Sequence, residues 1–158
     1  MERRDGLLSW LHEAQERSGR NYLDAKELAA AGKRFGLSGA ELRGVASYYS
    51  MYSLKPRGRH LIRVCDSPVC RMLGSRSVLE ALGGALGIDG EGTDAEGRFT
   101  LETCQCLGHC ASAPVVAVDD TVHADLGTTG IRAVLAAVRE ADEADEAASS
   151  PGGAGHGA

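Results

Sequence analysis

The sequence has few aromatic residues, no long apolar run and no excess of positive charge. Trp, Tyr and Phe make up 4% of the 158 residues, which argues against a nucleic-acid binder that stacks bases on aromatic side chains and against an aromatic cofactor cage. No apolar stretch approaches the roughly 18 residues of a membrane span. The first residues also lack the apolar core of a secretory signal. We therefore expect a soluble, cytoplasmic chain without direct membrane insertion.

The charge balance argues against a general attraction to nucleic acid or anionic membranes. Residues 140–158 hold five acids and no Lys or Arg, whereas residues 1–139 carry 17 acidic and 17 basic residues. A formally neutral body creates no long-range field that would attract polyanions. The short basic segment at residues 55–59 (KPRGR) contains Pro and Gly, and we expect it to form a solvent-exposed turn.

Residues 1–54 are predicted to form a small helical bundle. The spacing of Asp24 and Glu27 is that of a helix N-terminal capping box, and Ser38 and Glu41 repeat it. Gly36 stands where a helix C-cap belongs. Most of the aromatic residues lie in this part of the chain. We expect them to form the core of the bundle, with a partner-docking surface as the alternative.

Residues 55–140 change to a pattern of alternating strands and helices, which predicts an α/β fold. The tail at residues 141–158 is acidic and then rich in Gly, Ala and Ser. We expect it to be disordered, because it has little apolar area to offset the entropy of ordering. Strands are predicted at residues 61–65, 99–104, 114–118 and 122–126, and helices over the apolar residues of 78–86 and 131–138.

The chemistry of the chain is concentrated in its five cysteines. Cys65-x4-Cys70 and Cys106-x3-Cys110 form two pairs, each just past the end of a predicted strand, and Cys104 is the fifth. Cytoplasmic thiols stay reduced, so ligands or core residues are favoured over disulfides. Because adjacent strand ends would bring the two loops together, we expect the two pairs to present four thiolates around one point.

Four thiolates suit either zinc or an iron–sulfur cluster. Zinc sites favour tight C-x2-C pairs, and the wider gaps here favour a two-iron rhomb, although spacing alone leaves zinc and unligated thiols open. A disulfide reductase is disfavoured because no C-x-x-C is present. We expect Cys104 to be a small buried core residue. We expect His109 to be a plain loop residue, because a Rieske-type site needs two histidines on one iron.

Two runs, RGRHLIRVCDSPVCRMLGS and GRFTLETCQCLGHCASAPVVAVDD, resemble the thioredoxin-like [2Fe–2S] ferredoxin subunit of NADH dehydrogenases. That family includes the small [2Fe–2S] subunit of the complex I NADH-input module. Related subunits occur in NAD-reducing hydrogenases and NAD-dependent formate dehydrogenases. The upstream run GLSGAELRGVASYYSMYSLKP resembles the helical N-terminal region of the family, so the resemblance covers roughly residues 7–139.

The resemblance implies an N-terminal helical bundle, residues 1–54, packed on a thioredoxin-like [2Fe–2S] domain, residues 55–140. It maps one [2Fe–2S] cluster onto Cys65, Cys70, Cys106 and Cys110. It places FMN and NAD(H) on a larger flavoprotein partner, beside further iron–sulfur subunits of a multisubunit oxidoreductase. The chain would accept electrons from that flavin and be non-catalytic alone. It would be cytoplasmic, including as a peripheral part of a membrane-associated complex. The alternative is a zinc-stapled interaction module without redox activity.

Overall fold

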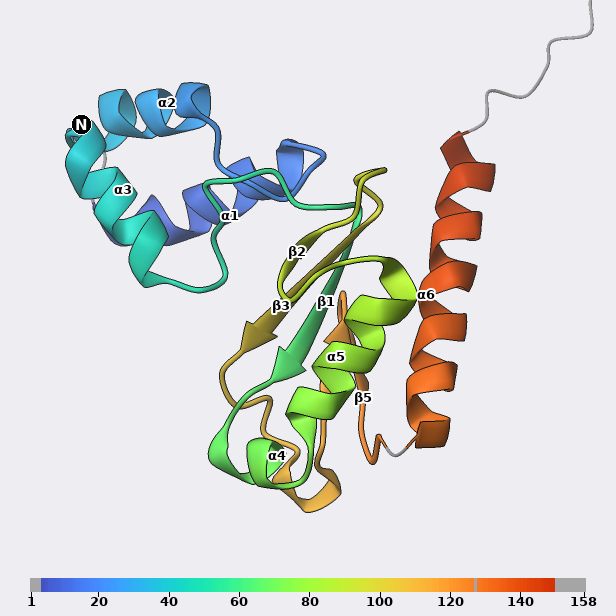
Figure 1. The fold of residues 1–158 in the computed structure, drawn as a ribbon. Helices are drawn as coiled ribbons and strands as arrows, with labels where there is room; N and C mark the ends of the chain where they lie inside the picture. The colour runs from blue at the N-terminus through green and yellow to red at the C-terminus, as the bar shows by residue number, and fades with distance from the viewer. Residues whose placement is uncertain (1–3, 127, 150–158) are drawn as a thin grey trace, which may run out of the picture.

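A computed structural model describes residues 4–126 and 128–149, and in it a helical bundle stands beside one end of a helix-covered sheet (Figure 1). The bundle begins with a 3-10 turn, Arg4–Gly6, and continues with helices α1 (Leu7–Arg17), α2 (Ala25–Phe35) and α3 (Gly39–Tyr48). These helices pack around an apolar core of their own. Its buried members are Leu7, Leu11, Ala14, Leu23, Leu28, Ala31, Phe35, Leu42, Ala46 and Tyr52.

The predicted ends of the bundle helices are confirmed. Asp24 caps α2 by accepting a hydrogen bond from the Glu27 amide at 2.7 Å. Ser38 and Glu41 form a reciprocal capping box at the start of α3. Gly36 ends α2 with φ of +66°, a left-handed conformation that glycine adopts without strain.

The sheet has five strands in the order β2-β3-β1-β4-β5. The central strand β1 runs parallel to β3 and antiparallel to β4, while β2 and β5 pair antiparallel at the two edges. The predicted strand from Phe99 to Cys104 is confirmed, and β1 begins one residue earlier than predicted. The strands are β1 (His60–Cys65), β2 (Gly92–Thr93), β3 (Phe99–Cys104), β4 (Val116–Val118) and β5 (Thr121–His123).

Helices α5 (Ser75–Leu86) and α6 (Thr128–Ser149) cover one face of this sheet (Figure 1). The interior between them is apolar and contains Ile62, Leu101, Val116, Leu82 and Val134, all fully buried. The short helix α4 (Pro68–Met72) connects β1 to α5 and lies at the end of the sheet away from the bundle. Across residues 4–126 and 128–149, no helix combines the length and the apolar character needed to cross a membrane.

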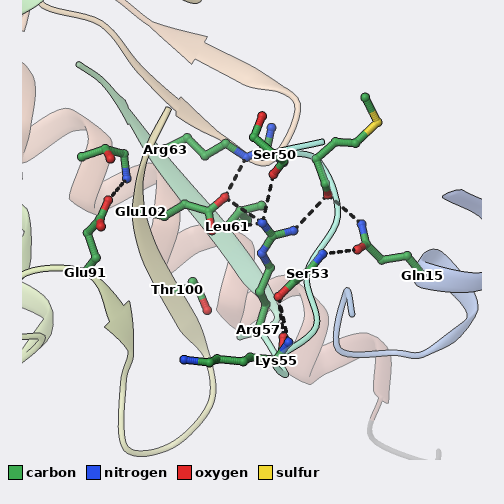
Figure 2. Close-up of polar contacts among 12 residues, drawn as sticks. Gln15, Ser50, Ser53, Lys55, Arg57, Leu61, Arg63, Glu91, Thr100 and Glu102 are labelled. Carbon is green, nitrogen blue, oxygen red and sulfur yellow. Dashed lines mark hydrogen bonds and ion pairs between the residues drawn. The ribbon is translucent and has the colours of Figure 1, made fainter. Parts of the chain in front are cut away.

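The other face of the sheet meets the segment of residues 50–58, which we call the strap. Its Arg57 is only 6% exposed and donates to the carbonyl oxygen of Met51 at 3.2 Å and to both carboxylate oxygens of Glu102 at 3.0 and 3.1 Å (Figure 2). Gly58 lies so close to the Phe99 backbone that a Cβ there would stand 2.7 Å from it. The expectation of a wholly solvent-exposed basic turn is therefore wrong, because Glu102 supplies a partner for the buried guanidinium.

The predicted disordered tail also needs correction, because α6 continues as a helix to Ser149. Asp142 is buried on this extension and accepts a hydrogen bond from Arg98 at 3.2 Å. It also forms an ion pair with Arg59 at 3.3 Å. Two guanidinium groups thus neutralise the carboxylate and hold the last turns of α6 against the sheet. The rest of the predicted tail, residues 150–158, lies outside the described part of the chain.

Candidate functional site

The cysteines gather where β1 and β3 end side by side. Cys65 and Cys104 are register partners and the last residues of these parallel strands. The carboxyl ends of parallel strands meet at one edge of a sheet, so the loops that follow them are brought together. Cys70 lies in α4 directly after β1, while Cys106 and Cys110 belong to the loop after β3, where a 3-10 turn (Cys110–Ser112) follows. The sequence-based expectation of two neighbouring loops is confirmed.

The two pairs differ in exposure. Cys65 and Cys70 are each 1% exposed, whereas Cys106 and Cys110 lie at the surface. The Sγ atoms of Cys106 and Cys110 are 3.8 Å apart, and the Gly108 amide donates to the Cys106 sulfur at 3.4 Å. Gly108 has a φ of +82°, so the turn that delivers its amide to sulfur requires a residue without a Cβ.

The two cysteines of the buried pair differ in acidity. Burial opposes ionisation of Cys65, but hydrogen bonds from the backbone amides of Ser67 and Leu107, together with the Cys70 thiol, lower its pKa. Burial and the neighbouring Cys65 raise the pKa of Cys70 to about 11. Cys65 therefore loses its proton more readily than Cys70.

The exposed pair repeats this arrangement. The Gly108 amide and then the Cys110 thiol lower the pKa of Cys106. The hydrogen bond to Cys106 and the charge on Cys106 raise the pKa of Cys110. In each pair one cysteine is thus more acidic than the other, and a bound metal ion would deprotonate both.

The donor set fits an iron–sulfur cluster. Bonds of about 2.3 Å from one tetrahedral metal would separate two sulfurs by about 3.8 Å, and Cys106 and Cys110 have this separation. Cys65 interacts electrostatically with both cysteines of the exposed pair, so the pairs face the same space. Among the residues that the structure describes, no group of three or more His, Cys, Asp or Glu is arranged for a single metal ion.

Ser67 is a site residue that the sequence analysis did not single out. Its side chain lowers the pKa of both Cys65 and Cys106, so it lies close to both pairs. It is also the N-cap of α4, followed by Pro68 at the first helical position. A Ser-Pro pair between two cysteines indicates a helix start, and this signal could have placed Ser67 beside the sulfurs.

Cys104 and His109 were expected to lie outside the set of ligands. Cys104 is half-buried and packs against the small apolar cluster of Cys65, Cys70 and Val115, and burial raises its pKa to about 11. His109 is exposed and precedes the 3-10 turn that begins at Cys110. Neither belongs to the two thiol pairs.

Comparison with known proteins places this chain in a family. The thioredoxin-like [2Fe–2S] ferredoxins match residues 1–139. The chain belongs to this family. The [2Fe–2S] cluster of the family and its helical N-terminal part agree with the expectations from the sequence, and so does the α/β, thioredoxin-like fold class.

Two curated relatives are components of one kind of enzyme, NADH-quinone oxidoreductase. The chain is 40% identical to the relative from Pseudomonas aeruginosa over 118 residues, which are 75% of this chain and 71% of that one. It is 32% identical to the relative from Rhizobium meliloti, covering 96% of this chain and 90% of the relative. Both relatives are single subunits of that oxidoreductase.

A solved structure of an NAD+-reducing [NiFe]-hydrogenase in the air-oxidized state is similar over 85% of this chain, with a TM-score of 0.73 and 26% identity. The match spans 23% of the hydrogenase chain. The fold described above therefore recurs as one part of a longer polypeptide.

Proposed function

We propose that this chain is an electron-transfer subunit that holds one [2Fe–2S] cluster on Cys65, Cys70, Cys106 and Cys110. The observation that carries the proposal is the meeting of two thiol pairs, one buried and one exposed, at the ends of β1 and β3. When bound, the cluster accepts and releases one electron at a time.

The cysteines and the neighbouring backbone amides have different roles in the proposed site. Cys65 and Cys70 would anchor the cluster in the interior, and Cys106 and Cys110 would hold it at the surface, where a partner can approach. The amides of Ser67, Leu107 and Gly108 stabilise negative charge on sulfur. Such N–H···S hydrogen bonds favour the reduced, more negative state and so help to set the reduction potential.

The electron donor in this proposal is the flavin of a separate subunit that oxidises NAD(P)H. The names of the relatives, NADH-quinone oxidoreductase and NAD+-reducing hydrogenase, support a nicotinamide as the source of electrons. The sequence of this chain has no G-x-G-x-x-G that opens a helix after a strand. FMN and NAD(H) would therefore be bound by the partner, and further iron–sulfur subunits would receive the electron.

Reduction of the isolated chain tests the proposal. Freshly purified protein should be brown, contain two irons per chain and be bleached by dithionite. It should not be reduced by NADH until the flavoprotein that co-purifies with it from its native host is added back. Rapid reduction by NADH alone would contradict the proposal, and a colourless protein loaded with zinc would favour the interaction module instead.

A further inference from the structure

A cavity of about 220 Å³ lies beside the first turn of α5, at the end of the sheet where β1 and β3 stop (Figure 1). In α/β folds, a helix that follows a parallel strand begins at this end of the sheet, and phosphate groups commonly bind there. None of the five cysteines lines this cavity. Its polar lining residues are Asp66, Arg71, Ser75, Arg76, Glu91 and Thr103.

Ser75 is the residue of this cavity that most needs a partner. It is only 1% exposed, and within residues 4–126 and 128–149 its hydroxyl oxygen has no hydrogen-bond partner. An unpaired buried hydroxyl is unfavourable, so such groups normally bind ordered water or a ligand. Because Ser75 lines the cavity, a ligand held there would supply the acceptor that the protein does not.

The start of α5 provides further donors. Gly74 is the N-cap with a φ of +99°, and no side chain caps the helix. The first amides of an α-helix have no acceptor within the helix, and the helix dipole favours negative charge at this end. An anion bound beside the first turn would therefore accept hydrogen bonds from amides that no side chain satisfies.

Two arginines and two acids border the cavity, and their pairing determines the charge that its ligand should carry. Arg71 forms an ion pair with Asp66 at 3.4 Å, and Glu91 accepts a hydrogen bond from the Thr103 amide. Arg76 is exposed, and in the described part of the chain it has no ion pair. The two acids belong to no group of three or more His, Cys, Asp or Glu among the described residues that is arranged for a metal ion. An anion therefore suits the cavity better than a cation.

We propose that this cavity binds the phosphate group of a small molecule, with Ser75, Arg76 and the first amides of α5 as donors. A tetrahedral oxyanion accepts hydrogen bonds from several directions, and a guanidinium group matches the geometry of phosphate. The volume suits inorganic phosphate or one phosphate group of a larger molecule, because pockets that enclose whole drug-sized ligands are larger, at roughly 300 Å³ or more. The proposal is independent of the proposed function.

Calorimetric titration of the full, cluster-loaded chain tests the proposal. The buffer should be free of phosphate and low in salt, and the three probes are inorganic phosphate, adenosine monophosphate and adenosine. Phosphate and adenosine monophosphate should bind, whereas adenosine should not. Equal affinities for the two phosphates would assign the site to the free anion. A higher affinity for adenosine monophosphate would assign it to a phosphate ester.

Variants of the lining residues should change the affinity for phosphate in opposite directions. Ser75→Ala and Arg76→Ala each remove a donor, so binding should weaken by about tenfold or more. Glu91→Gln removes a negative charge from the border of the cavity, so binding should become tighter. Arg43→Ala is the matched control, because Arg43 is an exposed arginine of α3 in the bundle, and it should leave the affinity unchanged.

The stability of Ser75→Ala separates a ligand-binding hydroxyl from a structural one. Without phosphate, this variant should be at least as stable as the unmodified chain, because the hydroxyl has no protein partner to lose. A clear fall in its melting temperature without phosphate would show that the hydroxyl serves the fold, and would overturn the proposal. Absence of phosphate binding at millimolar concentrations, or equal binding by the unmodified chain, Ser75→Ala and Arg76→Ala, would overturn it as well.

Discussion

Cys106 and Cys104 are two residues apart at the end of β3, yet their surroundings give them different roles. Cys106 is exposed and paired with Cys110, and Cys104 packs into a small apolar cluster. Cys106→Ser should lose or strongly perturb the visible spectrum of the cluster, because a rhomb needs four thiolates. Cys104→Ser should keep the spectrum, with a modest loss of stability at most. Absorbance and iron content measure both, and the reverse result would contradict the ligand assignment.

Glu102 neutralises the buried Arg57, so its removal should be costly. Glu102→Ala leaves the guanidinium buried with carbonyl acceptors only, and we expect the free energy of unfolding to fall by about 2 kcal/mol, because Glu102 is itself partly exposed. The matched control is Glu96→Ala, which breaks an exposed ion pair with Arg98 and should change stability by less than about 0.5 kcal/mol. Urea unfolding of the cluster-loaded chain measures the free energy of unfolding of both variants. Equal losses in the two variants would show that the Arg57–Glu102 contact of the strap does not stabilise the fold.

At the scale of elements, helices and strands with local signals were predicted well. The capping residues Asp24 and Ser38 and the C-cap Gly36 fix helix ends through contacts within four residues, and the alternation in Phe99–Cys104 marks a strand. The missed features depend on distant residues. Arg57 is buried because of Glu102, 45 positions away, and Asp142 holds the end of α6 through Arg98, 44 positions away.

Truncation after Glu140 tests the extension of α6. The truncated chain loses Asp142 and leaves Arg59 and Arg98 without this carboxylate, so we expect the free energy of unfolding to fall by about 2 kcal/mol. Asp142→Asn in the full chain should reproduce most of the loss, and Glu143→Gln, at an exposed site, should have no effect. The visible spectrum should be unchanged in all three. An unaltered melting temperature after truncation would restore the prediction of a tail that does not dock.

At the scale of the whole molecule, the cysteines lie outside the two large apolar cores. The bundle core and the sheet core contain no cysteine, whereas the small third cluster contains Cys65 and Cys70. The spacing of the cysteines allowed the family to be inferred from the sequence, whereas the position of Ser67 beside Cys65 and Cys106 could not be. The spacing of the cysteines in the sequence indicates which thiols can lie close together. The exposure of each cysteine and the position of the Ser67 hydroxyl depend on how α4 packs.

Removal of the cluster should therefore loosen one end of the molecule and spare the rest. After iron chelation under reducing conditions, hydrogen exchange should quicken in residues 66–72 and 105–115. Protection should persist in the strands around Ile62 and Leu101 and in α2, because their apolar contacts remain. Reconstitution with iron and sulfide should restore the slow exchange. Global loss of protection would contradict this view and make the metal a requirement for the whole fold.

The course of α6 has a practical consequence. The helix ends beside the bundle end of the sheet, and the cysteine loops lie at the opposite end (Figure 1). A tether attached after Ser149 would hold the molecule with Cys106 and Cys110 pointing away from the support. Immobilisation on a bead through this point should leave the cysteine loops accessible for a partner to bind. On an electrode, the same orientation should slow direct electron transfer between the cluster and the electrode surface.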